Sequence, residues 1–209
     1  TDSKEAADPV RKWSTQSREA APWYQHEEMG YNYRMSNVVA GVVRGQLPHL
    51  NEHIRQKRAV YERYQAGLAD LPVRMNPFDE KNSIPNFWLS CLIIDSDAMC
   101  PQVRGEKDPL YVNVPGKSCP TEILAALNAF NAEGRPIWKP MHMQPIYRMN
   151  EFITAKGSGR AQSNAYLEKT ESLDAGADMF HRGLCLPSDN KMTPRQQDRI
   201  RDVIHRCFK

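Results

Sequence analysis

Two short segments carry the residue types best suited to binding a charged ligand that contains a ring. The first is G-Y-N-Y-R-M-S-N at residues 30–37, and the second is R-P-I-W-K-P-M-H at residues 135–142. In the first, a glycine permits a tight backbone, and amide and guanidinium donors stand just before a possible helix N-terminus, which suits phosphate. In the second, basic groups and an indole stand together, which suits a diphosphate next to a base or sugar ring.

Each segment also has a purely structural explanation. Tyr31 and Tyr33 could pack at a domain boundary while Asn32 and Ser36 act only as helix caps. In the second segment, Trp138 and the isoleucine before it could enter the core from a short strand while the charges stay solvated. The residue pattern alone leaves both explanations open.

Other catalytic or metal-binding chemistries find little support in the sequence. The aromatic, hydrogen-bonding stretches 13–18 and 23–26 suit a pocket lining, but exposed connections often have the same composition. His49 and His53 have the helical i, i+4 spacing without an H-E-x-x-H pattern, so we expect them to face solvent. The sequence has no nucleophile elbow, Gly-rich phosphate loop or C-x-x-C pair. We therefore assign no catalytic residue and no metal ligand.

Composition argues against several classes of partner. The 209 residues include 28 basic and 25 acidic side chains, so we expect no nucleic-acid or membrane partner that depends on a strong field. No apolar run approaches the roughly 18 residues that span a bilayer. The five cysteines are odd in number and not arranged in pairs, which favours a reduced, cytoplasmic setting. The chain opens on Thr1 rather than methionine, which suggests that it is part of something longer.

The hydrophobic period predicts the elements that position the first segment. Residues 1–29 show no sustained period, so we expect an extended segment or loop there. A long amphipathic helix is expected over residues 36–68, with one miss in its apolar stripe at Lys57. Pro48 predicts a kink or break near residues 45–49, because its ring clashes with a carbonyl one turn earlier.

Beyond residue 70 the pattern changes to short strands and helices, which is the order of a small α/β sandwich. An apolar run at 86–95 predicts a strand buried on both faces. A polar stretch at 155–174, rich in Gly and Ser at its start, is expected to be a mobile loop. The other expected elements are an irregular excursion at 96–119 with a short strand at 110–112, a helix at 121–131 capped by Thr121, strands at 135–139 and 183–187, and a helix that opens at Thr193-Pro194.

Six motifs follow one another along the chain: S-T-Q-S-R at 14–18, Y-Q-H at 24–26, G-Y-N-Y-R-M-S-N at 30–37, G-Q-L at 45–47, R-P-I-W-K-P-M-H at 135–142 and G-L-C-L-P-S at 183–188. Together and in this order they resemble the C-terminal half of the DegT/DnrJ/EryC1/StrS family, the pyridoxal-phosphate-dependent sugar aminotransferases of the aspartate-aminotransferase fold. The W-K-P-M-H and L-C-L-P-S stretches are most similar to the subgroup that acts on UDP-linked 4-keto-6-deoxy-N-acetylhexosamines.

The resemblance implies a fold class and a division of the chain. The fold would be α/β, the small C-terminal α/β sandwich domain of the fold-type I pyridoxal-phosphate enzymes, with a long kinked helix leading into it. Residues 1–35 would be the remnant of the end of the large cofactor domain, and residues 36–70 the connecting helix. Residues 71–209 would form the small domain.

The resemblance also implies roles for individual residues. Asn32 would reach the phosphate of pyridoxal phosphate in the neighbouring subunit of a homodimer, and Arg34 would lie beside the same site. The residues implied for nucleotide-sugar binding are Arg135, Trp138, Lys139 and His142, with Tyr24 and His26 as looser matches.

The family's chemical centre lies outside this sequence. Family members carry the lysine that forms a Schiff base with the cofactor in a large N-terminal domain, before the segment where this chain begins. We therefore expect amino transfer from glutamate to a UDP-4-keto-6-deoxy sugar from a longer polypeptide that binds pyridoxal phosphate, whereas this chain alone would be inactive and bind no cofactor. The alternatives are a non-catalytic module that binds nucleotide sugar or a partner, and a fragment of a pyridoxal-phosphate-dependent sugar dehydratase, in which histidine replaces the lysine.

Overall fold

Two compact units make up the chain, Thr1–Asn51 and Glu52–Lys209. The domain boundaries expected after residues 35 and 70 stay a prediction. Within the described ranges, every helix is too short or too polar to cross a lipid bilayer. The structure is a computed structural model, and the residues it describes are 1–79, 81–104, 109–147, 149–151, 153 and 174–209.

The N-terminal unit begins with a helix where the sequence analysis expected none. Helix α1 runs over Lys4–Ser14, so the expectation of loop or extended chain throughout residues 1–29 is wrong. Ser3 caps the helix by accepting a backbone N–H of the first turn. Glu5 in the first turn and two basic residues in the last turn complement the helix dipole. The expectation gave too much weight to Pro9, which the helix accommodates in its interior.

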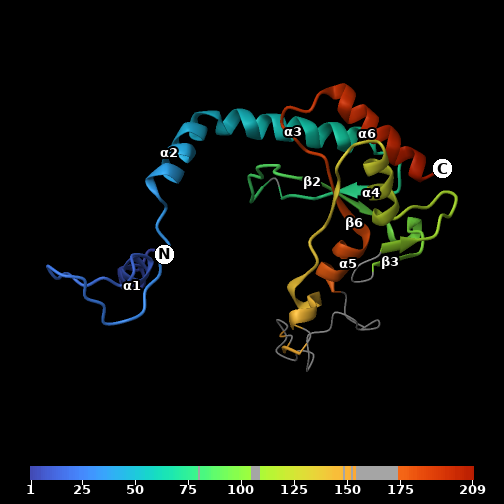
Figure 1. The fold of residues 1–209 in the computed structure, drawn as a ribbon. Helices are drawn as coiled ribbons and strands as arrows, with labels where there is room; N and C mark the ends of the chain where they lie inside the picture. Colours follow the sequence, from blue (N-terminus) through green and yellow to red (C-terminus); the bar gives the residue numbers. More distant parts are fainter. Residues whose placement is uncertain (80, 105–108, 148, 152, 154–173) are drawn as a thin grey trace. The chain divides into compact units, whose positions relative to one another are not determined.

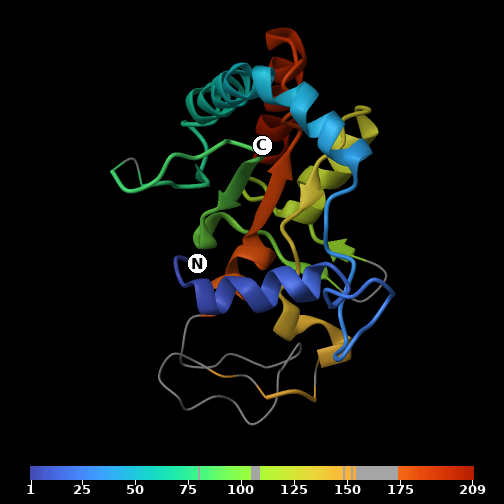
Figure 2. The ribbon, with the colours of Figure 1, turned by 90° about the vertical axis from the view of Figure 1, so that its left-hand side faces the viewer.

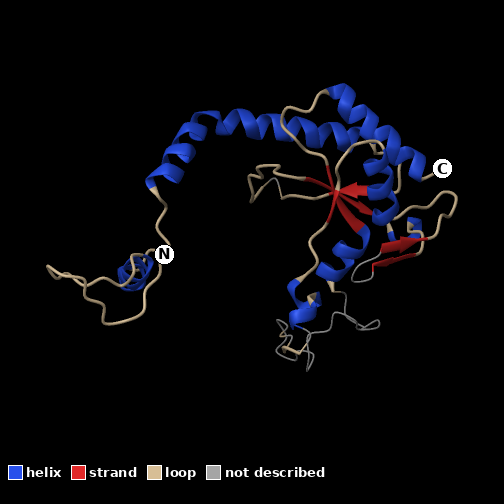
Figure 3. Ribbon diagram, in the orientation of Figure 1, coloured by secondary structure: helices blue, strands red, loops and turns tan. Residues whose placement is uncertain are grey.

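The loop that follows α1 returns along the end of that helix. The backbone N–H of Tyr31 donates to the carbonyl of Trp13 at 2.7 Å, and the N–H of Tyr33 donates to the carbonyl of Ser14 at 3.1 Å. Two isolated bridges add Thr15↔Asn32 and Arg18↔His26. Figure 3 shows this part of the chain as loop rather than strand, yet these bonds fix the backbone of the G-Y-N-Y-R motif.

The expected break in the long helix is confirmed. Helix α2 covers Asn37–Gln46, a 3-10 turn η1 covers Leu47–His49, and α3 covers Leu50–Gly67, so the regular helix is interrupted at Pro48. Ser36 caps α2 through its side chain, as the sequence allowed. The apolar stripe is buried only in its second half: the buried side chains are Val60, Tyr61, Tyr64 and Leu68, whereas the valines of α2 are at least half exposed.

A four-stranded antiparallel sheet organises the C-terminal unit, with the strand order β1-β2-β6-β5. Figure 2 shows the arrows of β2 and β6 side by side, so segments far apart in the sequence meet at the centre of the sheet. A separate hairpin pairs β3 with β4. The strands are β1 (Val73–Met75), β2 (Ser90–Ile94), β3 (Gln102–Arg104), β4 (Pro109–Tyr111), β5 (Arg135–Pro136) and β6 (Gly183–Leu186).

Helices pack against this sheet to form one core (Figure 1). Helix α3 is joined there by α4 (Pro120–Ala129) and α6 (Pro194–Cys207). Helix α5 (Ala175–Arg182) leads directly into β6, and three 3-10 turns, η2 (Ser96–Ala98), η3 (Met141–Met143) and η4 (Pro145–Tyr147), lie in the connections. The side chains with no exposed surface at the centre are Leu92, Ile94, Ile123, Leu127, Leu184 and Ile204.

Strand β2 is shorter than the apolar run at 86–95 predicted. The side chain of Asn86 accepts the backbone N–H of Trp88 at 3.0 Å, and Phe87 between them has a φ of 52°, so the chain turns before the strand begins. Along β2, fully buried side chains alternate with partly exposed ones. The expectation of burial on both faces is therefore wrong for β2, whose second face is covered only in part.

The later elements match the expected order with shifted ends. Helix α4 begins at Pro120, so its N-cap is Cys119 rather than the expected Thr121. The strand expected at 135–139 is confined to β5, and α5 was not expected. The last helix has the capping box of Thr193 and Gln196. The mobile loop expected at 155–174 falls, except for its last residue, outside the described residues.

Candidate functional site

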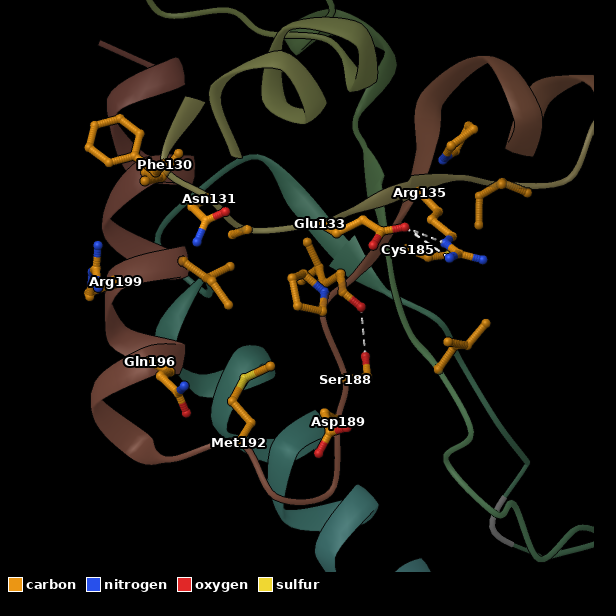
Figure 4. A pocket seen from close by; sticks show the side chains of 18 of the residues that line it. Phe130, Asn131, Glu133, Arg135, Cys185, Ser188, Asp189, Met192, Gln196 and Arg199 are labelled. Atoms are coloured by element: carbon orange, nitrogen blue, oxygen red, sulfur yellow. Dashed lines mark hydrogen bonds and ion pairs between the residues drawn. The ribbon is translucent and has the colours of Figure 1, made fainter. Parts of the chain in front are cut away.

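A groove of about 1360 Å³ lies in the C-terminal unit beside the β5 edge of the sheet. Figure 4 shows Gln196 and Arg199 of α6 on one side of it and Glu133 and Arg135 on the other. Its lining has six basic side chains against three acidic ones, so the groove favours an anionic ligand. The basic side chains are Lys57, Arg135, Lys139, Lys191, Arg199 and Arg206.

Three of the substrate residues expected from the sequence line this groove: Arg135, Trp138 and Lys139. The guanidinium of Arg135 pairs with the carboxylate of Glu133 at 2.9 Å, and both side chains are about three-quarters exposed. The ring of Trp138 lies 5.9 Å from that of Trp88, centroid to centroid, with the planes 32° apart. The groove thus combines accessible positive charge with an aromatic pair.

The G-L-C-L-P-S segment forms a rigid part of the groove wall. The hydroxyl of Ser188 donates to the carbonyl of Leu186 at 2.8 Å and accepts the N–H of Ser90 at 3.0 Å. The buried hydroxyl of Tyr64 donates to the carbonyl of Pro187 at 2.9 Å, and burial raises the pKa of this phenol. The tyrosine therefore stays neutral and keeps its hydrogen bond at any physiological pH.

His142, the fourth expected substrate residue, is not among the residues that line the groove. Its Nε2 atom lies 2.7 Å from a carboxylate oxygen of Asp174. The same carboxylate caps α5 by accepting the backbone N–H of Ala177 at 3.0 Å. His142 thus ties the segment after β5 to the start of α5, and its contact with substrate stays a prediction.

The remaining expected residues lie in the N-terminal unit. Asn32 and Arg34 are exposed, and the backbone of Asn32 is held by its bridge to Thr15. The ring of Tyr24 lies under the guanidinium of Arg18 at 4.3 Å. The Nδ1 atom of His26 lies 2.8 Å from the carbonyl oxygen of Gln16. The aromatic pair Tyr31 and Tyr33 stacks with centroids 5.2 Å apart.

Several groove residues were not predicted from the sequence. The ammonium group of Lys57 donates to the carbonyl of Ser188, and the signal for it was the one miss in the apolar stripe of the long helix. Arg199 and Arg206 lie seven residues apart on α6, and hence on one helical face. Trp88 gave no signal that distinguishes it from a core residue of the apolar run.

A pair of thiols lies in the sheet next to the groove. Cys91 and Cys185 are opposite each other in β2 and β6, with their sulfur atoms 3.7 Å apart. The backbone N–H and carbonyl of Cys91 both bond to Asn76, so toward β6 the two cysteines occupy a non-hydrogen-bonded position, where side chains approach most closely. The hydrogen bond with Cys91 and the charge of Arg135 lower the pKa of the Cys185 thiol.

We expect a mild thiol oxidant such as diamide to join Cys91 and Cys185 in a cross-strand disulfide. Non-hydrogen-bonded partners have Cα atoms about 4.5 Å apart, which lies within the range that a disulfide bridges. Intact mass should fall by two hydrogen atoms, and peptide mapping should assign the bridge. Cys91→Ser should abolish that bridge, and a first disulfide at other cysteines would contradict the expectation.

Solved structures place the fold in a known class. The structure of PseC from Helicobacter pylori, an aminotransferase involved in the biosynthesis of pseudoaminic acid, aligns over 100% of this chain and 47% of its own with a TM-score of 0.69 and 13% identity. This chain therefore has the fold of the C-terminal part of the pyridoxal-phosphate aminotransferases, and the expected fold class is confirmed.

The family model of the DegT/DnrJ/EryC1/StrS aminotransferases matches residues 1–205, and the chain belongs to this family. It is 33% identical over 204 residues to the pyridoxal phosphate-dependent aminotransferase EpsN of Bacillus subtilis (strain 168), covering 97% of this chain and 44% of EpsN. It is 26% identical over 185 residues to the GDP-perosamine synthase of Vibrio cholerae, covering 88% of this chain and 41% of that protein. The chain thus spans less than half the length of these relatives.

Proposed function

We propose that this chain is the C-terminal part of an aminotransferase that moves the amino group of glutamate to the keto group of a UDP-linked 4-keto-6-deoxy sugar. The observation that carries the proposal is the basic groove with its aromatic pair, in a chain of a sugar-aminotransferase family. The division at residues 1–35, 36–70 and 71–209 and the homodimer belong to the same proposal.

In this proposal the groove holds the nucleotide part of the substrate. The exposed face of Trp138 offers a stacking surface for the base, and Trp88 supports the ring from the side. Arg135 and Lys139 neutralise the diphosphate. Because Ser188 and Tyr64 fix the adjoining wall by hydrogen bonds, little of the groove has to be ordered when the ligand binds.

The G-Y-N-Y-R loop fits the phosphate of pyridoxal phosphate. Among the described residues, none hydrogen-bonds the side chain of Asn32, while its backbone is held in place by the loop. The loop therefore fixes where the amide is presented and leaves its N–H groups available to donate, and Arg34 adds positive charge two residues later. When bound, pyridoxal phosphate supplies the electron sink that lets an amino group move between two carbon skeletons.

The proposal assigns the cofactor to a subunit that also carries the lysine, so this chain alone should be inactive and bind no pyridoxal phosphate. Asn32 would serve the cofactor of the neighbouring subunit. The test is a polypeptide that includes the preceding cofactor domain, supplied with pyridoxal phosphate, glutamate and UDP-4-keto-6-deoxy-N-acetylglucosamine. Mass spectrometry should show the 4-amino sugar. Conversion only of the corresponding GDP-linked 4-keto sugar would reject the UDP assignment, and a deoxygenated product without nitrogen would indicate a dehydratase.

Replacing Trp138 by alanine should weaken the affinity for UDP-N-acetylglucosamine by at least tenfold, about 1.4 kcal/mol. The side chain is 60% exposed, so its removal should leave the fold intact. Isothermal titration of the variant against the parent chain measures the effect. Trp23→Ala is the matched control, since Trp23 is 64% exposed and does not line the groove. Equal losses in both variants would reject the stacking role of Trp138.

A further inference from the structure

A cluster of two thiols and a carboxylate lies away from the groove. The sulfur atoms of Cys100 and Cys119 and a carboxylate oxygen of Glu122 all lie within 4.8 Å of one another. The backbone brings them together: the N–H of Cys100 donates to the carbonyl of Ser118 at 2.9 Å, beside the parallel bridge Met99↔Ser118. Neither cysteine lines the groove, so the cluster is independent of the proposed function.

The cluster has the spacing of a metal-ligand set. The Cys100 sulfur lies 3.8 Å from an oxygen of Glu122. In a tetrahedral zinc site with Zn–S of about 2.3 Å and Zn–O of about 2.0 Å, two sulfur ligands lie about 3.8 Å apart and a sulfur and an oxygen about 3.5 Å apart. The observed distance is thus close to the one that an ion would impose, and only small side-chain adjustments would close the set.

The two cysteines are buried, as suits such a site, while the partly exposed carboxylate gives an ion access from solvent. Cys100 is 2% exposed and Cys119 is not exposed at all, whereas Glu122 is partly exposed. Two thiolates in this position would need a compensating cation, because buried charge without a partner is costly. The carboxylate of Glu122 offers the entry side and leaves a fourth position for water.

Helix capping is the competing explanation, but it accounts poorly for sulfur at this position. Cys119 is the N-cap residue of α4, and its sulfur accepts the N–H of Glu122 at 3.5 Å. A serine or aspartate would accept that bond better, since a thiol is a weak acceptor. The hydroxyl of Ser118 meanwhile donates to Glu122 at 2.9 Å, which orients the carboxylate toward the thiols. Both bonds are of the kind that hold metal ligands in place.

A nearby arginine provides the charge balance. Two thiolates and one carboxylate around a divalent ion leave one net negative charge. The guanidinium of Arg104 is largely buried, interacts electrostatically with Cys119, and has one buried nitrogen, Nη2, without a hydrogen-bond partner among the described residues. The positive charge of Arg104 would offset the net negative charge of the metal-bound site.

We propose that Cys100, Cys119 and Glu122 form a binding site for a thiophilic divalent cation such as Zn²⁺. Soft sulfur ligands select this class of ion over Mg²⁺ or Ca²⁺. The ion ties the chain after η2 to the start of α4, the helix that leads into residues 130–139 of the groove wall. The site therefore stabilises the scaffold of the groove without contacting its ligand.

Binding should strengthen as pH rises. Cysteine binds such an ion as the thiolate, so the ion must displace the proton of each thiol. The apparent affinity should therefore rise by up to tenfold per pH unit for each proton displaced. A pH-independent affinity between pH 6 and 8 would contradict thiolate ligation.

The test titrates the whole chain, stripped of metal and kept reduced with a phosphine, with Zn²⁺ against a chromogenic chelator and with Cd²⁺ in the ultraviolet. We expect one equivalent bound and a sulfur-to-cadmium charge-transfer band. Cys100→Ser and Cys119→Ser should each lower the affinity at least tenfold. Cys119→Ser supplies a better helix cap, so a loss of metal in that variant cannot be attributed to failed folding.

Matched controls separate this cluster from the other thiols. Two variants leave this cluster intact, the double variant Cys91→Ser/Cys185→Ser and the single variant Cys207→Ser. Both should still bind one equivalent of Zn²⁺ and show the sulfur-to-cadmium charge-transfer band. Glu122→Gln should weaken binding while the charge-transfer band persists at saturating Cd²⁺. Loss of the band in the Cys91/Cys185 variant, its survival in Cys100→Ser and Cys119→Ser, or the absence of any bound equivalent would each overturn the proposal.

Discussion

Leu184→Ala should destabilise the C-terminal unit by about 3–5 kcal/mol, because it removes a buried side chain at the centre of the core and leaves a cavity. Leu184 has no exposed surface and lies in β6 between Leu92 of β2 and Pro136 of β5. Domains are stable by only about 5–15 kcal/mol, so the loss would remove much of the total. Urea unfolding followed by tryptophan fluorescence measures it as a lower midpoint at an unchanged slope.

The control for this prediction is Leu110→Ala in the β3–β4 hairpin. Leu110 is 66% exposed, so its truncation should change the free energy of unfolding by less than about 0.5 kcal/mol. Equal effects of the two variants would show that β6 does not occupy the centre of the core. On heating, Leu184→Ala should lose UDP-sugar binding at a lower temperature than Leu110→Ala, since β6 continues into Pro187 and Ser188 of the groove wall.

Local signals in the sequence were enough to predict part of the fold. The break at Pro48 and the last helix at Thr193 follow from residues within one turn of the feature. Helix α1 was missed because Pro9 was taken to interrupt it, although Ala6, Val10 and Trp13 recur at helical spacing. Strand β2 was overextended because the turn at Phe87 depends on an Asn86 side-chain hydrogen bond.

The candidate sites depend more strongly on long-range contacts. Trp138 and Lys139 were found because they are adjacent in one motif, whereas Lys57 reaches the groove from a helix eighty or so residues earlier. Cys100 and Cys119 could not be paired from the sequence, since no short spacing links them and only the bridge Met99↔Ser118 brings them together. Residue spacing thus reveals sites within one element but not sites made by chain crossings.

The loop that carries Asn32 depends on a glycine that no other residue can replace. A Cβ atom added at Gly30 would lie 2.1 Å from the carbonyl carbon of Gln16 and 2.3 Å from the backbone nitrogen of Ser17. These backbone atoms cannot easily move away. Gln16 donates its N–H to the carbonyl of Tyr31 at 3.0 Å, and the buried hydroxyl of Ser17 donates to the carbonyl of Met29 at 3.1 Å.

Gly30→Ala should therefore detach the loop from α1, at a cost of about 3 kcal/mol or more, the upper part of the range for overpacking. The backbone N–H groups of Tyr31 and Tyr33 bond to that helix, so their hydrogen-exchange protection should fall at least tenfold. In the longer polypeptide of the proposed function, Asn32 would lose its fixed position and the affinity for pyridoxal phosphate should fall with it.

Gly41→Ala and Gly45→Ala are the matched controls for Gly30→Ala. Both glycines lie in α2, and an added Cβ atom would meet nothing within 4 Å at either position. Because alanine has the higher helix propensity, each change should stabilise α2 by up to about 1 kcal/mol. If Gly30→Ala left the protection of Tyr31 and Tyr33 unchanged, as these controls should, the loop would not be anchored to α1 in solution. The positioned amide on which the cofactor assignment depends would then lose its structural basis.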